Sequence, residues 1–271
     1  MSENRGNLLS AVGARTLDAI RYAGGMTVLL GRTLRWTGKG LIQPKVKFGF
    51  RAMVGQMVRV GLRSLGIVML VQGFIGVILA LQLAPTLEQY GQLDKIANVL
   101  ATGGFRMLGP IITGVVLSGF AGASIAAELG TMVVAEEIEA LEAMALNPVK
   151  FLVVPRVLAT VVMMVLLTII ADLMIALGGW VTARAVLGPA AYVGFVENMR
   201  IQLRFTDFFT GLTQAAVFGM LISLIACHQG LGVRGGAEGV GKATTMTVVH
   251  SIVAIVLAAG VFTMVFYVYE L

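Results

Sequence analysis

Charged residues are scarce in this sequence. Asp, Glu, Lys and Arg make up 13% of the 271 residues, whereas hydrophobic residues make up 58%. Soluble domains carry about 25% charged residues, so a water-soluble globule built from this chain would lack the polar surface to cover itself. The mean hydropathy of +0.91 agrees with this. The composition therefore predicts a protein whose solvent is the lipid bilayer.

Cysteine and histidine are also nearly absent. The single cysteine, Cys227, excludes an intramolecular disulfide and any metal cluster built from several cysteines. The two histidines, His228 and His250, lack a credible set of further ligands, so we expect no metal site. Charged residues interrupt any apolar core within residues 1–30, and we therefore expect no cleavable signal peptide.

Long apolar runs are what the sequence has instead. A helix needs about 20 apolar residues to cross the hydrocarbon layer. The runs of sufficient length are Leu65–Ala84, Ile96–Ala127, Val157–Ala183, Phe208–Cys227 and Thr244–Tyr269. The second is overlong, and Gly103-Gly104 and Gly109-Pro110 interrupt it, which indicates a bent or partial helix at its start. The predicted fold class is an all-α membrane protein with five transmembrane helices in one domain, residues 65–271.

The N-terminal segment, residues 1–64, is basic. Residues 1–63 hold eleven Lys or Arg and only two acidic residues. A basic segment that precedes membrane spans is typical of the cytoplasmic side, which argues against a nucleic-acid partner. Apolar residues from Leu9 to Ile20 recur at roughly helical spacing between charged ones, so we expect an amphipathic helix at the membrane interface. A solvated basic tail is the alternative.

Loop charges predict the orientation in the membrane. With the N-terminus in the cytoplasm, the segments on that side are 1–63, 128–156 and 228–243, and they carry 15 of the 20 Lys and Arg residues. Five crossings then place the C-terminus, Leu271, on the outer side. The long outer connection Leu187–Asp207 has an apolar pattern that indicates a short amphipathic helix.

The connection between the second and third runs holds a cluster of acidic residues. A helix-forming block over about residues 132–147 carries four glutamates beside a narrow apolar stripe. Asn147-Pro148 is expected to end this helix. By composition alone, a solvated connector between two spans is an equal alternative.

Three stretches of the sequence resemble one known family. They read ELGTM…EEIEALEAM…NPVKFLVVPRV from Glu128, GVGKATTMTVVHS over Gly239–Ser251, and LGPIITGVVLSGFAGASIAAELG over Leu108–Gly130. These are similar to signature segments of the MlaE family, the permeases of bacterial and plastid MCE-type lipid transporters. Together with the number of apolar runs, the resemblance covers nearly the whole chain.

This resemblance implies the permease subunit of an ATP-driven ABC transporter in the bacterial inner membrane. Such a subunit moves phospholipid or a related lipid between that membrane and a periplasmic MCE-domain carrier. The implied partners are a second copy of the chain, cytoplasmic ABC ATPase subunits, the MCE protein and a small STAS-domain subunit. ATP and Mg would bind to the ATPase, so this chain would hold no cofactor and would not itself be an enzyme.

The resemblance also implies site residues. The acidic block would be a coupling helix that contacts the ATPase through Glu136, Glu137, Glu139, Leu141, Glu142 and Met144. A lipid cavity would be lined by Leu79, Leu83, Leu87 and Tyr90, whose spacing puts them on one helix face, together with Leu108 and Ile111. Ordinary core packing is the alternative for these apolar residues.

Three ionisable residues, Arg106, Glu128 and Asp172, lie in or at the edge of the apolar runs. Ionisable groups are costly there, so they indicate either a functional site or structural hydrogen bonds between spans. The chain departs from the family's pattern at Met107, where many members have Glu, and at Phe120 and Val133, where many have Arg.

Other motifs favour different functions less well. The phosphate-loop lookalikes Gly230–Gly235 and Gly236–Ala243 follow an apolar helix rather than a strand, so we expect no nucleotide there. Ser124 and His250 suggest an intramembrane serine hydrolase, but sequence shows neither their proximity nor an oxyanion hole. The hydrolase and a non-transporting membrane scaffold remain as alternatives to transport.

Overall fold

A computed structural model describes residues 3–42 and 50–269, and within them the chain is helical with no strand. Five helical runs in this part of the chain are long and apolar enough to cross a membrane. They are Ala52–Gln89, Leu93–Val134, Val149–Leu187, Phe205–Leu231 and Gly236–Val268. The predicted all-α class and the five predicted spans are confirmed.

Three of these runs contain more than one helical segment. The first consists of α2 (Phe50–Met57), the π-helical η1 (Val58–Leu62) and α3 (Arg63–Gln89). The second consists of η2 (Leu93–Lys95), α4 (Ile96–Val99), η3 (Leu100–Leu108), α5 (Gly109–Leu117), η4 (Ser118–Gly122) and α6 (Ala123–Val134). The third consists of η5 (Val149–Val153), α8 (Val154–Thr182) and η6 (Ala183–Leu187). The boundary expected at residue 64 falls inside the continuous first run.

The irregular start of the second span follows from its glycines and proline. Gly103 and Gly104 lie in the π-helical η3, and Pro110 follows in the first turn of α5, where it has no N–H to donate to the preceding turn. Gly109 leaves no room for a side chain, because a Cβ there would lie 2.0 Å from Asp172 Oδ1. The span therefore changes its helical phase next to Asp172 of α8.

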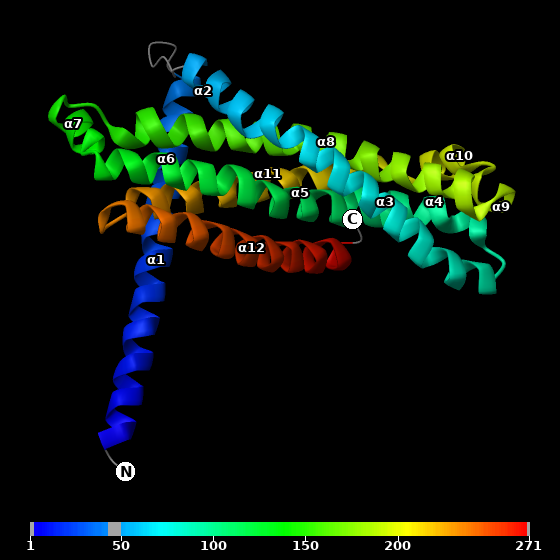
Figure 1. The fold of residues 1–271 in the computed structure, drawn as a ribbon, viewed down its shortest axis with the longest axis horizontal. Coiled ribbons are helices and arrows are strands. Elements are labelled where there is room, and N and C mark those ends of the chain that lie inside the picture. The colour runs from blue at the N-terminus through cyan, green and yellow to red at the C-terminus, as the bar shows by residue number, and fades with distance from the viewer. Residues whose placement is uncertain (1–2, 43–49, 270–271) are drawn as a thin grey trace.

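The spans lie side by side in one bundle (Figure 1). α3 packs mainly on α8, α8 packs on α11 (Phe205–Leu231), and α12 (Gly236–Val268) packs on α6 and α11. One apolar cluster surrounds Phe218 and Ile222 in α11. A second, separate cluster surrounds Ile96 and Phe195. The most tightly packed pair is α3 and α8, whose backbones touch.

The connections mark the two ends of the bundle. The short helix α7 (Glu137–Ala143) lies at one end, here called the α7 end, and α9 (Pro189–Tyr192) and α10 (Phe195–Gln202) lie at the other, the α10 end (Figure 1). The outer connection was predicted as one helix, but Gly194, with φ of 79°, divides it into two. Phe195 then turns into the apolar cluster of the α10 end.

The N-terminal helix α1 (Glu3–Ile42) runs across the spans near the α7 end instead of along them (Figure 1). Leu29 and Thr33 are buried against the bundle, whereas Leu17 and Ile20 are exposed. The Tyr22 ring packs against His228 and His250, with ring centroids 5.0 and 5.1 Å away. Burial raises the pKa of the Tyr22 phenol above its ordinary value, because it disfavours the charged form. The phenol that contacts the two histidines is therefore neutral.

Candidate functional site

The helix α7 is the exposed element between the second and third spans. Glu137, Glu139 and Glu142 on it are exposed, as is Glu136 immediately before it, while Ile138 and Leu141 are half-buried. Met144, at its end, is 62% exposed. All six predicted coupling residues therefore lie on α7 or directly beside it. Five of them are exposed, and Leu141 is half-buried.

Two left-handed residues fix the direction of α7. Glu136 has φ of 59° and separates α7 from α6, and Ala145 has φ of 58° just after α7. The Leu146 N–H donates to the Leu141 carbonyl (3.0 Å) and the Ala145 N–H to the Glu142 carbonyl (2.9 Å). This is the Schellman arrangement that ends helices, with alanine at the position usually held by glycine. α7 is consequently shorter than the predicted block of residues 132–147.

Asn147 begins the third span, and it was wrong to expect that Asn147-Pro148 would end the coupling helix. The Asn147 side-chain oxygen accepts hydrogen bonds from the backbone N–H groups of Val149 (3.0 Å) and Lys150 (3.3 Å). Those two groups lack carbonyl partners within the helix, so the side chain satisfies them as a helix cap does. The Lys150 ammonium lies 5.3 Å from the Trp36 ring centroid, which joins this segment to α1.

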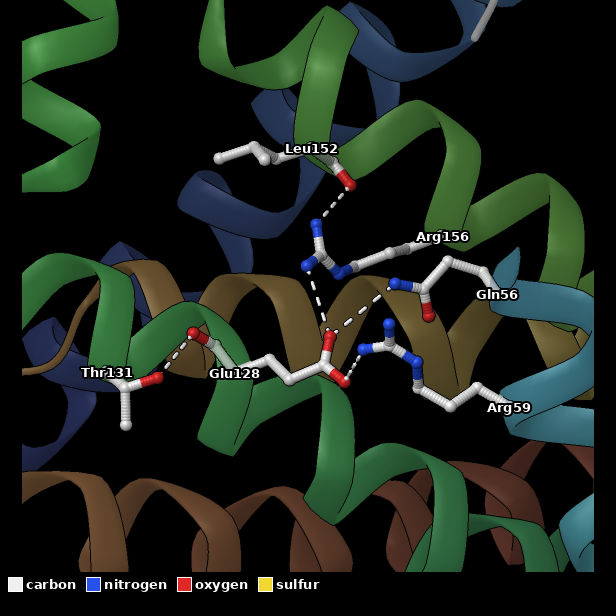
Figure 2. A network of polar contacts seen from close by, with 6 residues as sticks. All are labelled: Gln56, Arg59, Glu128, Thr131, Leu152 and Arg156. Atoms are coloured by element: carbon white, nitrogen blue, oxygen red, sulfur yellow. Dashed lines mark hydrogen bonds and ion pairs between the residues drawn. The ribbon is translucent and has the colours of Figure 1, made fainter. Parts of the chain in front are cut away.

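A polar network lies next to α7 and is centred on Glu128 in α6 (Figure 2). One carboxylate oxygen pairs with Arg59 of η1, and the other accepts from Arg156 of α8 (3.2 Å) and from the Gln56 amide of α2 (3.5 Å). The Arg156 guanidinium also donates to the Leu152 carbonyl (3.0 Å). The network therefore joins the first three spans at their α7 ends.

Burial differs between the two arginines. The Arg156 side chain is 9% exposed, Glu128 is 27% exposed and Arg59 is 49% exposed. A buried pair with several hydrogen bonds is held firmly, and removing one partner leaves the other charge uncompensated. An exposed pair contributes little to stability. Arg156–Glu128 is thus the structural half of the network, and Arg59–Glu128 is the half that can open at small cost.

The middle of the bundle holds a second polar group. The Gln72 amide donates to the Gly109 carbonyl (3.1 Å) and to the Thr113 hydroxyl (2.9 Å), linking the first and second spans. Asp172 lies on the other side of Gly109 and is 2% exposed, and its Oδ1 has no hydrogen-bond partner among the described residues. The structure thus brings the predicted Asp172 to the irregular start of α5.

A cavity of about 630 Å³ opens at the α10 end. Its wall includes Arg106 of η3, Arg204 just before α11, and Phe266 near the end of α12. Arg106 donates to Asp207 (3.4 Å), and its guanidinium lies 4.9 Å from the Phe266 ring centroid. Asp207 also accepts from the Arg204 backbone N–H (3.3 Å). These contacts hold Arg106 in place and leave the Arg204 side chain exposed at the cavity.

A smaller, almost wholly apolar cavity of about 310 Å³ adjoins the first. Arg106, Phe266 and Tyr267 line both cavities, and Met107 lines the apolar one. The Arg204 guanidinium can hold a phosphate or carboxylate beside Arg106, which is already paired with Asp207, and the apolar space next to them can hold a hydrocarbon chain. Together the two cavities have the chemistry to bind an anionic amphiphile.

The predicted lipid-lining residues are not gathered at these cavities. Leu79, Leu83 and Leu87 pack against the apolar cluster of the α10 end, and Tyr90 is 74% exposed beyond them. Ile111 packs in the other cluster, and Leu108 is half-buried in the second span. Within one chain these residues therefore have different surroundings, and their role in lipid binding stays a prediction.

Several residues of the polar sites were missed by sequence reasoning. Arg59 and Arg204 entered the sequence analysis only in the count of positive charges that predicts orientation. Asp207 was named only as the last residue of the connection Leu187–Asp207. Gln72 offered a signal, because it is a lone amide within a long apolar run. The serine–histidine pair is not brought together: His250 Nδ1 lies 2.9 Å from the Gln229 amide, and Ser124 is exposed on α6.

Five long apolar helical runs with a short exposed helix between two of them are the architecture of a multi-pass membrane permease. Residues 53–265 match the family model described as Permease MlaE. The chain is 32% identical to a probable ABC transporter permease protein of Rickettsia felis, over 96% of this chain and 98% of that protein. It therefore belongs to the MlaE permease family, as the sequence motifs predicted.

Two further relatives broaden the comparison. The chain is 31% identical to the intermembrane phospholipid transport system permease protein MlaE of Haemophilus influenzae, over 90% of this chain and 92% of that protein. It is 33% identical to the chloroplastic protein TRIGALACTOSYLDIACYLGLYCEROL 1 of Arabidopsis thaliana, over 82% of this chain and 63% of that protein.

Proposed function

We propose that this chain is the transmembrane subunit of an ATP-driven ABC transporter that moves phospholipid or a related lipid between the bacterial inner membrane and a periplasmic MCE-domain carrier. The observation that carries the proposal is α7, an exposed acidic helix held between two spans by left-handed residues and by the Glu128 network. A separate ATPase, with its own ATP and Mg, would engage this helix. The name of the Haemophilus relative, an intermembrane phospholipid transport system permease protein, supports phospholipid as the cargo.

In this proposal the α7 end faces the cytoplasm and α1 lies in the membrane interface. The exposed apolar side chains Leu17, Ile20, Val28 and Leu34 on α1 support burial in lipid headgroups. The anion-binding cavity between Arg106 and Arg204 then opens toward the periplasm, where the carrier protein would exchange lipid with it.

A second copy of the chain is the proposed partner within the membrane. The exposed side of α12 is rich in large apolar residues, among them Val256, Leu257, Val261 and Met264. Such a face needs lipid or another protein against it, and symmetric dimers are the commonest oligomers. A homodimer would place this face, which adjoins the cavities through Phe266, at or near the subunit boundary.

The orientation is tested by topology reporters. At Leu271 we expect a fused alkaline phosphatase to be active and a fused fluorescent protein to be dark, because the C-terminus is predicted to be periplasmic. At Ala143 we expect the reverse, since loop charges fix orientation. The two measurements are alkaline phosphatase and fluorescent-protein activity in intact cells. A cytoplasmic signal from the Leu271 fusion would overturn the proposed orientation.

The coupling role is tested by reversing charge on α7. We expect the double variant Glu137→Lys/Glu139→Lys to insert and melt like the wild type, because both side chains are exposed. Recovery of the ATPase on purified permease should fall by at least about tenfold, since about 1.4 kcal/mol is a factor of ten and like charges at an interface cost more than that. The measurement is co-purification, followed by lipid-stimulated ATP hydrolysis.

Glu197→Lys is the matched control, because Glu197 is an exposed glutamate on α10 at the opposite end of the bundle. It should leave ATPase recovery unchanged. Equal recovery from the double variant and the wild type would remove α7 from the ATPase interface.

A further inference from the structure

We propose that Arg59 is a positioning residue for energy coupling. Through Glu128 it ties the first span to the two spans that carry α7, and so transmits movement of α7 to the first span. This inference rests on the proposed transport function and concerns how that function is driven.

The first step is the position of the network relative to α7. Glu128 lies in α6, which leads into α7, and Arg156 lies in the first turn of α8, which follows it. Their contact (3.2 Å) therefore bridges the two stems of the α7 segment. Because Arg156 is almost fully buried, the stems are held together and move as one unit when α7 is displaced.

The second step is the connection to the first span. Gln56 and Arg59 reach Glu128 from the α2–η1 part of that span (Figure 2). Within the described residues, the other side-chain hydrogen bonds from this span to the second span come from Gln72, in the middle of the bundle. The Glu128 contacts are thus the polar link at the end where α7 lies.

The third step is the local backbone. Arg59 lies in the π-helical η1, between two regular helices. A π-helical turn shifts the phase of the residues that follow it, and such turns are frequent at functional sites. η1 allows Arg59 to face α6 while α3 continues along α8. A segment that can gain or lose this turn is suited to a movement of the first span about its α7 end.

The fourth step is the difference in exposure. Arg59 is 49% exposed and Glu128 is already satisfied by Arg156, so loss of Arg59 leaves no buried charge unpaired. The fold should therefore survive without Arg59, whereas the ion pair between the first span and Glu128 is lost. This separates a coupling role from a purely structural one.

The experiment uses Arg59→Gln in the complete transporter, reconstituted in liposomes with its ATPase and carrier. ATP hydrolysis and transfer of a fluorescent phospholipid are measured together. We expect assembly and thermal midpoint to match the wild type, and lipid moved per ATP to fall at least about fivefold, the lower range of coupling between sites. Arg59→Lys keeps the charge and should restore most of the ratio.

Arg63→Gln is the matched control, because Arg63 is an exposed arginine one turn further on and has no ion pair with the described residues. It should leave the ratio unchanged. A wild-type ratio in Arg59→Gln, an equal fall in both glutamine variants, or failure of Arg59→Gln to accumulate would each overturn the inference. If the wild-type complex binds no ATPase or moves no lipid, the proposed function itself fails.

Discussion

Gly76→Ala is expected to separate the first and third spans and to lower the thermal midpoint by on the order of 10 °C. A Cβ at Gly76 would lie 2.1 Å from the Ile175 carbonyl oxygen and 3.0 Å from the Gly179 amide nitrogen. Both atoms belong to the backbone of α8, so no change of rotamer relieves the overlap, and the helices must move apart. Contact between membrane helices depends on such close approach, because lipid tails are as apolar as the side chains that pack there.

The same interface offers a reciprocal variant and a control. Gly178→Ala on α8 should be equally harmful, because its Cβ would lie 2.1 Å from the Gly73 carbonyl oxygen. Gly66→Ala on α3 has no atom within 4 Å of the new Cβ and should be neutral or slightly stabilising, since alanine favours helix. Thermal unfolding in detergent is the measurement. Equal midpoints for Gly76→Ala and Gly66→Ala would show that the two backbones are not in contact.

The spans were predictable because each is a local property of the chain. Every predicted apolar run lies within a helical run of the structure or, for the last, ends one residue beyond it. The first run was predicted too short: its helix extends back to α2, since Arg59 and Arg63 lowered the apolar signal there without interrupting the helix. A helix can continue through such arginines because their long side chains carry the charged group to water or to a partner.

The shape of the α7 segment was predictable only in outline. Acidic and apolar residues at helical spacing indicated a helix, but its length depends on Glu136 and Ala145 in left-handed conformations. Neither is glycine or asparagine, the residues that usually signal such a position. Local backbone hydrogen bonds accompany the turn at Ala145, and the residue types do not signal either conformation.

The partners of the ionisable residues could not be read from sequence either. Arg106 and Glu128 were marked by their cost in an apolar environment, yet their partners Asp207 and Arg59 lie on other elements far along the chain. Which residues meet depends on how the spans are arranged around one another. The surroundings of the predicted lipid-lining residues were not readable for the same reason: spacing gives a helix face, but not what that face touches.

Arg204→Glu is expected to lower the phospholipid bound per purified complex by about tenfold or more, because a charged hydrogen bond contributes about 1.5–3 kcal/mol and the new charge repels a phosphate. Arg204 is exposed at the wall of the cavity, so the fold should be unaffected. The measurement is native mass spectrometry of the complex, with thermal stability measured in parallel. Arg184→Glu, at the same end but outside the cavity wall, is the control for a general effect of charge.

Leu87→Arg distinguishes this cavity from the stripe that the family resemblance indicates. Leu87 is half-buried and packs with Leu83 against the apolar cluster around Ile96 and Phe195, so an arginine there should lower the thermal midpoint by overpacking. Lipid per folded complex should stay at the wild-type level. If Leu87→Arg instead keeps its stability and loses lipid while Arg204→Glu keeps lipid, the stripe lines the lipid path and the arginine cavity does not.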